Sequence, residues 1–227
     1  HPGRRPNADA VAHQHAAAHA HPLYPADAMT QATDRLPFGY VLRGKVDLTK
    51  QPRLYFALNV LGLVILVAAG VLFVALARLL RPDAVTALFE QFSRGGSARQ
   101  IVLLLGILVV MLVIHEAIHG VFFWRFTGAR PKFGIGPGYA YAAAPGWYLP
   151  RNQYLVVGLA PLVLISLGGL ALITVMPASW IGALLALMIG NASGAVGDMA
   201  VVAWLLTLPK TALANDDGSA VTVYVPG

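Results

Sequence analysis

Four long apolar blocks constrain this sequence more than any other feature, because a single water-soluble core could not absorb them. They run over Leu54–Leu80, Ile101–Phe126, Tyr154–Met176 and Trp180–Leu206. Each block is close to the roughly 20 residues that a helix needs to cross the hydrocarbon core of a bilayer. The sequence therefore predicts an integral, multi-pass membrane protein with four membrane-spanning helices.

The composition agrees with lipid as the main solvent of the chain. Of the 227 residues, 57% are hydrophobic and 11% are charged, whereas soluble domains carry about 25% charged residues. The sequence has no cysteine, which excludes disulfides and thiolate metal sites. The net charge of +6 does not indicate a nucleic-acid partner, because the basic residues lie beside the apolar blocks, as juxtamembrane anchors do.

The chain divides into three predicted domains. They are a disordered Ala- and His-rich tail (1–38), a membrane-embedded domain (39–210) and an extramembrane C-terminal tail (211–227). The predicted fold class is all-α, a bundle of four transmembrane helices with short extramembrane strands or a re-entrant loop. Gly39–Leu48 and Ala220–Val225 are the candidate strands, and 127–153, rich in Gly and Pro, is the candidate re-entrant loop.

The distribution of Lys and Arg predicts that both termini are cytoplasmic. In this orientation the cytoplasmic segments carry Arg43, Lys45, Lys50, Arg53, Arg125, Arg130, Lys132, Arg151 and Lys210. The opposite side carries Arg78, Arg81, Arg94 and Arg99. Cytoplasmic loops are enriched in basic residues, so this orientation is favoured over its inverse.

The second apolar block contains the sequence His115-Glu116-Ala117-Ile118-His119. Helix positions i and i+4 share one face, so both imidazoles can reach a single metal ion. Glu116 lies about a third of a turn away, where it can act on a metal-bound water without ligating the metal. Zinc lowers the pKa of such a water to about 7, so Glu116 could accept its proton and later deliver it to a leaving amine. The motif therefore predicts zinc-dependent hydrolysis of peptide bonds.

Asp198 in the fourth block is the candidate third ligand, because catalytic zinc sites usually have three protein ligands. If the second and fourth helices enter from the same side, His115 lies ~21 Å and Asp198 ~27 Å along them, which are similar depths. A carboxylate at the membrane centre costs about 2.5–3.5 kcal/mol on insertion scales, which favours a functional role. Small residues around Asp198 would let the helices approach closely. Asn191, on a similar face, is a candidate for orienting a substrate carbonyl.

Other interpretations use the same residues. The polar side chains could form a buried hydrogen-bond network that joins helices. A zinc transporter, or another metal-binding membrane protein, could use His115, Glu116 and His119 as ligands, although four spans without an internal repeat make a small transporter. The protease and transporter hypotheses differ at Glu116, which only a transporter would need for metal binding. Zinc is inferred from ligand type, and His and carboxylate ligands suit other divalent ions as well.

Four segments of the sequence carry a resemblance to a known family. They are HEAIHG (His115–Gly120), GYAYAAAPGWYLPRNQY (Gly138–Tyr154), LAPLVLIS (Leu159–Ser166) and NASGAVGDM (Asn191–Met199). With these segments, roughly residues 35–210 resemble the putative zincin peptidase family of small prokaryotic membrane proteins. That family is itself similar to the site-2-type intramembrane metalloproteases.

The resemblance implies an intramembrane zinc endopeptidase of the prokaryotic cell membrane. It implies one zinc ion per chain, held by His115, His119 and Asp198. Glu116 would be the catalytic acid and base. The expected partners are a membrane protein or peptide substrate and the lipid bilayer, with a homo-oligomer as an open alternative.

The resemblance also bears on substrate binding. It suggests that an extended substrate segment pairs with an edge strand in the 127–153 loop. Tyr139 and Tyr141 in this loop are therefore candidate substrate contacts, although aromatic residues near a membrane are more often interfacial anchors.

Overall fold

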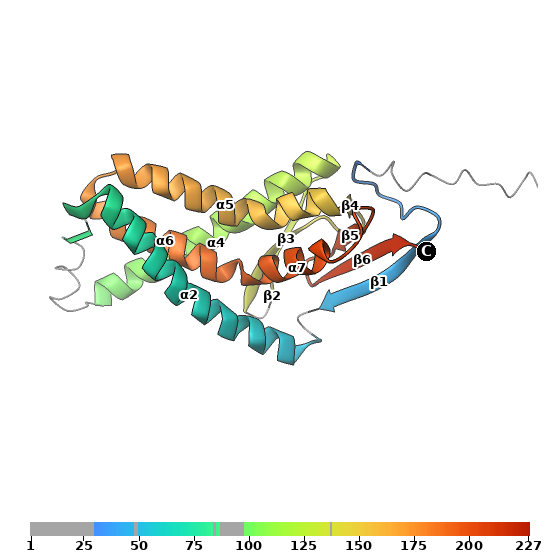
Figure 1. Ribbon diagram of the computed structural model, residues 1–227, viewed down its shortest axis with the longest axis horizontal. Helices are drawn as coiled ribbons and strands as arrows, with labels where there is room; N and C mark the ends of the chain where they lie inside the picture. The colour runs from blue at the N-terminus through green and yellow to red at the C-terminus, as the bar shows by residue number, and fades with distance from the viewer. Residues whose placement is uncertain (1–29, 48–49, 84, 87–97, 137) are drawn as a thin grey trace, which may run out of the picture.

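The computed structural model describes residues 30–47, 50–83, 85, 86, 98–136 and 138–227. Its helices are α2 (Pro52–Leu80), α4 (Ala98–Thr127), α5 (Arg151–Val175), α6 (Ala178–Gly194) and α7 (Val196–Leu206). The helices run side by side as an elongated bundle, and the strands gather at one end of it (Figure 1). Most of the predicted tail, residues 1–29, lies outside the described residues. Thr33, later in that tail, pairs with Tyr148.

Helices α2, α4 and α5 are each long and apolar enough to cross a membrane. Their outer surfaces stay hydrophobic, with Leu63 on α2 and Val113 on α4 both 63% exposed. A water-soluble bundle would place polar residues at such positions. Lengths and exposed surfaces therefore fit the first three predicted spans.

The fourth predicted span is divided in two. Helices α6 and α7 pass the same test only as a pair, and they are bent by 43° at the break between them. Ala195 lies at this break, where it ends α6 and precedes α7. The bend places Asp198 in the first turn of α7. The described residues thus contain three candidate spans, or four if the bent pair is one span.

The predicted all-α fold class is wrong, because six strands form two antiparallel sheets, a four-stranded one from distant segments of the chain and a local hairpin. The strands are β1 (Tyr40–Asp47), β2 (Lys132–Gly136), β3 (Tyr139–Ala143), β4 (Tyr148–Pro150), β5 (Leu213–Asp216) and β6 (Ala220–Pro226). One sheet has the order β1-β6-β5-β4, and the other is the β2-β3 hairpin. Two strands were predicted, near Gly39–Leu48 and Ala220–Val225, and both are confirmed as β1 and β6. Their pairing, which joins Tyr40 to Pro226, depends on contacts that no local pattern displays.

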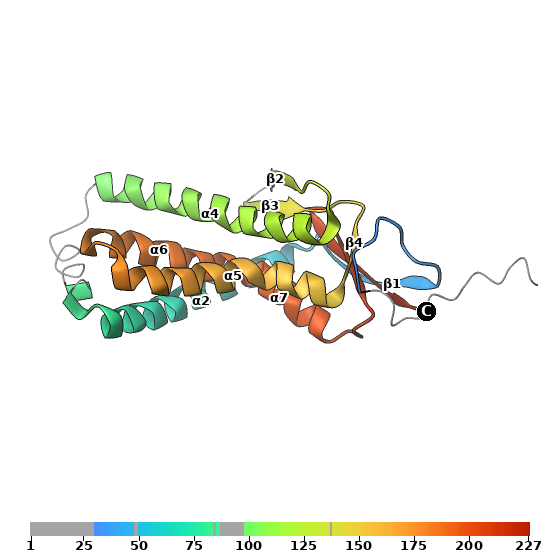
Figure 2. The same ribbon diagram turned by 90° about the horizontal axis from the view of Figure 1, so that it is seen from above.

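Helix α6 lies between α2 and α4 in the bundle (Figure 2). Small residues allow this packing, since a Cβ added to Gly62 of α2 would meet the Ser193 carbonyl oxygen of α6 at 3.4 Å. The Ser193 hydroxyl also donates a hydrogen bond to the Gly62 carbonyl oxygen at 2.9 Å. Towards the end opposite the sheets, Phe73 of α2, Ile173 of α5 and Ile181 of α6 belong to one buried cluster.

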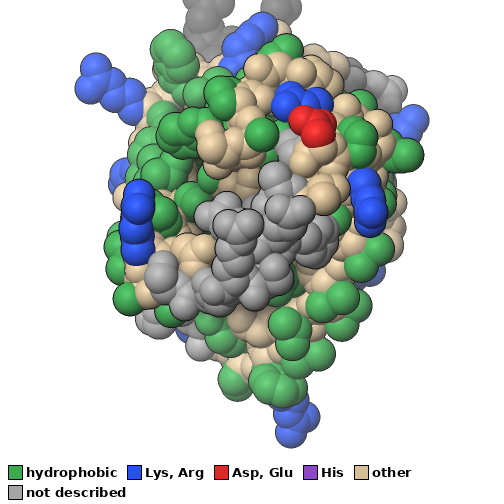
Figure 3. All heavy atoms as spheres, turned by 90° about the vertical axis from the view of Figure 1, so that its left-hand side faces the viewer, with side chains coloured by type: hydrophobic (Ala, Val, Ile, Leu, Met, Phe, Trp, Pro, Cys, Tyr) green, Lys and Arg blue, Asp and Glu red, His purple; other side chains and the backbone are tan. Residues whose placement is uncertain are grey.

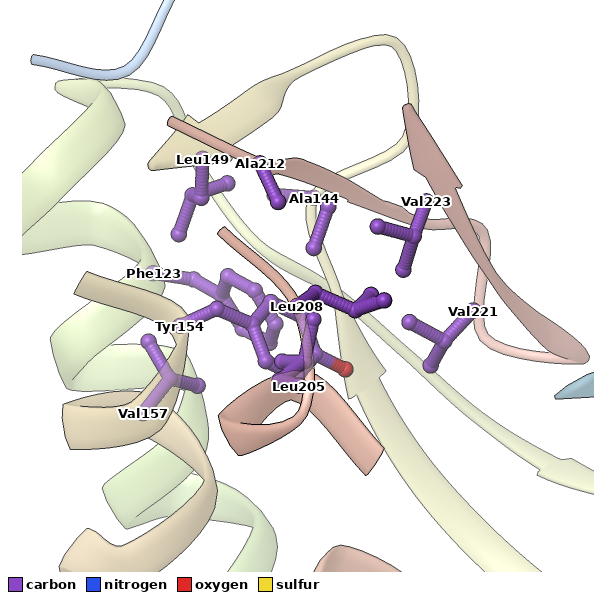
Figure 4. Packing of buried hydrophobic residues seen from close by; sticks show 11 residues of the cluster. Phe123, Ala144, Leu149, Tyr154, Val157, Leu205, Leu208, Ala212, Val221 and Val223 are labelled. Atoms are coloured by element: carbon purple, nitrogen blue, oxygen red, sulfur yellow. The ribbon is translucent and has the colours of Figure 1, made fainter. Parts of the chain in front are cut away.

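A second buried cluster attaches the four-stranded sheet to the helices. Phe123, Tyr154 and Leu205 contribute to it from α4, α5 and α7, and they face Leu149 and Val223 of the sheet (Figure 4). The opposite end of the bundle has no such layer among the described residues. Hydrophobic side chains cover much of that end, and Lys and Arg side chains protrude at its margin (Figure 3).

Helices α5 and α7 lie close together at Gly158. A Cβ added there would lie 2.9 Å from Cγ2 of Val202 on α7. We expect Gly158→Ala to separate the two helices and to lower the free energy of unfolding by about 1–3 kcal/mol. Thermal unfolding of the detergent-purified protein measures this change.

Gly168→Ala on the same helix is the matched control, because a Cβ at Gly168 meets no atom within 4 Å. Alanine favours helix by up to about 1 kcal/mol over glycine, so this variant should be at least as stable as the parent. Equal effects of the two substitutions on the free energy of unfolding would show that the contact between α5 and α7 at Gly158 does not limit stability.

Candidate metal centre

Three potential metal ligands converge near the middle of the bundle. His115 and His119 lie on α4, and Asp198 lies on α7. Nε2 of His115 is 3.1 Å from Nε2 of His119 and 3.2 Å from Oδ2 of Asp198. The remaining distance, from Nε2 of His119 to Oδ2 of Asp198, is 3.4 Å. These three atoms form a nearly equilateral triangle.

The triangle has the size of one face of a zinc coordination tetrahedron. Zinc binds imidazole nitrogen and carboxylate oxygen at about 2.0–2.2 Å, which places neighbouring ligand atoms roughly 3.3 Å apart in a tetrahedral site. Two nitrogens and one oxygen are also a donor set that zinc accepts. The residues therefore fit a zinc ion with a fourth position left for water or substrate.

The outer ring nitrogens show that both imidazoles direct a lone pair into this triangle. Nδ1 of His119 is 2.9 Å from the Val157 carbonyl oxygen, which can only accept a hydrogen bond. Nδ1 of His115 is 2.9 Å from Oδ1 of Asn191. Each Nδ1 therefore donates its proton outward, and each Nε2 carries a free lone pair. A cation bound between the two nitrogens and the carboxylate oxygen, which lie 3.1–3.4 Å apart, would satisfy both lone pairs and the charge of Asp198.

Both orienting contacts lead to α5 near its internal proline, Pro161. Pro161 has no N–H, so it cannot donate to the carbonyl of Val157, the residue four positions earlier. That carbonyl is left available for His119. The carbonyl of Pro161 accepts a hydrogen bond from Nδ2 of Asn191, which directs Oδ1 of the same amide towards His115. The missing N–H of Pro161 thus explains the acceptor that orients His119, and its carbonyl holds the amide that orients His115.

Glu116 lines a cavity of about 730 Å³ together with the three ligands. It follows His115 on α4, and its carboxylate lies near the backbone of Ala142 in β3. The cavity reaches from the metal centre to the hairpin and to the turn between β5 and β6. A carboxylate beside the metal ligands, in a cavity wide enough for a peptide, can act as a base on water.

The other residues that the sequence predicts for the site lie around the candidate metal ligands. Tyr139 and Tyr141 line the cavity from β3, and their rings cover the glycines opposite them on β2, Gly136 and Gly134. Asn191 is fully buried and contacts His115. This contact assigns Asn191 to the orientation of a ligand, and its action on a substrate carbonyl stays a prediction.

Two polar residues of the cavity have no counterpart in the sequence reasoning. The Tyr154 hydroxyl on α5 donates to Oδ2 of Asp216 on β5 at 2.5 Å, and both residues line the cavity. Burial raises the pKa of Asp216 to about 6, although hydrogen bonds from Tyr154 and from the Gly218 backbone oppose this increase. No motif marks Asp216, because it lies beyond the last apolar block and reaches the cavity only through sheet pairing.

The role of Pro161 leads to a prediction for metal affinity. Pro161→Ala restores an N–H that competes with His119 for the Val157 carbonyl, so α5 becomes a more regular helix. We expect the affinity for zinc to fall about 10–100-fold, as is typical when a partner that orients a metal ligand is lost. Competition with a chelating dye measures this affinity.

Pro177→Ala is the matched control, since Pro177 precedes α6 at the far end of the bundle from the sheets. It should leave the zinc affinity at the parent value. Thermal unfolding without metal should show Pro161→Ala no less stable than the parent. An unchanged affinity in Pro161→Ala would contradict the proposed origin of the His119 orientation.

Comparison with known proteins agrees with the geometry of the site. A family described as putative zincin peptidase matches residues 108–213, a segment that begins within α4 and ends at the first residue of β5. The match contains His115, Glu116, His119 and Asp198. No curated protein and no solved structure matches the chain significantly. The comparison thus shows that residues 108–213, slightly less than half of the chain, are similar to the putative zincin peptidase family.

Proposed function

We propose that the protein is an intramembrane zinc-dependent endopeptidase that resembles the site-2-type enzymes and cleaves peptide bonds in or near the transmembrane segments of other proteins. The observation that carries this proposal is the triangle of His115, His119 and Asp198, with Glu116 in the same cavity. Similarity to the putative zincin peptidase family supports zinc-dependent peptidase chemistry. The apolar outer surfaces of α2, α4 and α5 support a location within the bilayer.

The chemistry divides between the bound zinc and Glu116. His115, His119 and Asp198 would hold a zinc ion, which would supply positive charge to polarise a water molecule and the substrate carbonyl. Glu116 accepts the proton that the water loses as it attacks the carbonyl carbon. The protonated carboxyl of Glu116 then donates this proton to the amide nitrogen as the C–N bond breaks.

The hairpin provides a surface for the substrate backbone. Strand β3 pairs with β2 along one edge, and within the described residues its other edge has no partner strand. The side chains of Tyr139 and Tyr141 line the cavity from this strand. A substrate segment in extended form can add to the free edge of β3, and this places its backbone beside Glu116.

The two ends of the bundle suggest how the protein is oriented in the membrane. Both described ends of the chain and the hairpin lie at the sheet end, which contains most of the Lys and Arg residues that flank the apolar helices (Figure 1). We therefore place the sheets on the cytoplasmic side.

Substitutions at Glu116 and His119 test the proposed function. We expect Glu116→Gln to keep one zinc per chain but to lose at least about 10²-fold in hydrolysis, because it removes the base. His119→Ala should lose zinc, since it removes a ligand. Elemental analysis of protein lacking residues 1–29, whose His-rich stretch could also bind metal, measures occupancy. Cleavage of a membrane-segment peptide measures hydrolysis.

Glu90→Gln is the control, because Glu90 lies outside the proposed site motif, and it should match the parent in both assays. Loss of zinc in Glu116→Gln would favour the zinc transporter, in which Glu116 is a ligand. Full hydrolysis in Glu116→Gln would contradict the mechanism.

A further inference from the structure

The charges that line the cavity are all acidic or imidazole groups. Its lining includes the carboxylates of Glu116, Asp198 and Asp216 and the imidazoles of His115 and His119. No Lys or Arg of the described residues lines it. Asp198 is a proposed metal ligand and Glu116 is the proposed base, so the proposed mechanism gives Asp216 no role.

Asp216 is held rigidly at the cavity wall. Its Oδ2 accepts the hydrogen bond from Tyr154, and its Oδ1 accepts one from the backbone N–H of Gly218 at 2.9 Å. Gly218 packs against the ring of Tyr141, so the turn between β5 and β6 is fixed against β3. A carboxylate oxygen accepts two hydrogen bonds, which leaves each oxygen with a position for a further donor.

Within the described part of the chain, no basic side chain forms an ion pair with the carboxylate of Asp216. The neighbouring Asp217 lies within ion-pair distance of Lys45, as does Asp47, whereas Asp216 has no Lys or Arg within that distance. The pKa of Asp216, about 6, lies below neutral pH, so the group is mainly charged at pH 7. A zinc ion balances Asp198 and Glu116, and one negative charge then remains in the cavity.

We propose that Asp216 is a specificity site that binds a Lys or Arg side chain of the substrate. The inference rests on the proposed function, because it assigns the cavity to a peptide. A basic side chain supplies the missing positive charge and donates hydrogen bonds to the free positions of the carboxylate. An acidic side chain at the same place would be repelled by the uncompensated carboxylate of Asp216 and is disfavoured.

The position of Asp216 suggests where this basic residue lies in the substrate. Asp216 belongs to the sheet layer that follows the ends of α4 and α7, whereas the metal centre lies among the helices (Figure 1). Membrane proteins carry Lys and Arg directly beside the cytoplasmic ends of their spans. A substrate whose scissile bond lies within its span near this end would bring such a residue to Asp216.

Matched peptides test the inference. Each has one hydrophobic segment, is acetylated and amidated at its ends, and carries a single Lys or a Gln at successive positions beyond the segment. Fluorescence anisotropy measures their Kd for the zinc-loaded Glu116→Gln protein in detergent. We expect the Lys peptide to bind about 10-fold more tightly than its Gln counterpart at one or two positions. In Glu116→Gln/Asp216→Asn the two peptides should bind equally, and the Gln peptide should keep its Kd.

Asp217→Asn in the same background is the matched control, because Asp217 lies in the same turn but does not line the cavity. It should keep the 10-fold preference for Lys. Asn keeps an acceptor for the Gly218 N–H, its amide N–H can donate to the Tyr154 hydroxyl, and a buried charge is removed, so thermal unfolding should show Asp216→Asn at least as stable as the parent. A preference for Lys that survives Asp216→Asn, or the lack of any preference in the background protein, would overturn the inference. Failure of every peptide to bind, and to be cleaved by the parent, would instead overturn the proposed function.

Discussion

The backbone carbonyl of Val157 has no helical hydrogen-bond donor, because Pro161, four residues later, lacks an N–H. The candidate metal centre depends on this free carbonyl, which orients His119. An unpaired carbonyl in a membrane helix costs several kcal/mol, so the fold must supply another donor. His119 does this with Nδ1, and the opposite ring nitrogen is thereby directed towards His115 and Asp198. A stability requirement of α5 thus fixes the orientation of a ligand on α4.

The same centre brings α4 and α7 together at a cost that a bound cation offsets. Lone pairs of His115 and His119 face each other and the negatively charged carboxylate of Asp198, and these groups repel one another as long as no cation lies between them. The close contact at Gly158 allows α7 to approach α5, and the bend at Ala195 begins a new helix just before Asp198. Because the unfolded chain lacks this arrangement, metal binding adds directly to the stability of the fold.

The parts of the structure that sequence reasoning reached are those with a local pattern. Helix spacing places His115 and His119 on one face, and similar depth in the membrane identified Asp198 as a candidate for the same site. The all-α fold class failed because strands such as β1 and β6 are far apart in the sequence and pair through contacts that no window of residues contains. Pro161 did have a readable signal, since a proline inside an apolar helix frees the carbonyl four residues earlier. Asp216 had none, because only the sheet brings it to the cavity.

The cavity wall has two parts, one formed by helices with a local sequence pattern and one formed by strands that pair across the chain. The proposed catalytic groups lie on helices within residues 108–213, the segment that matches the family. Asp216 lies just beyond that segment, on a strand held between β4 and β6, and β6 is in turn held by β1. The cavity wall at Asp216 therefore depends on pairing between the two ends of the described chain. Substitutions in these strands can change the charge presented to a substrate without moving a metal ligand, so chemistry and selectivity can vary independently in this fold.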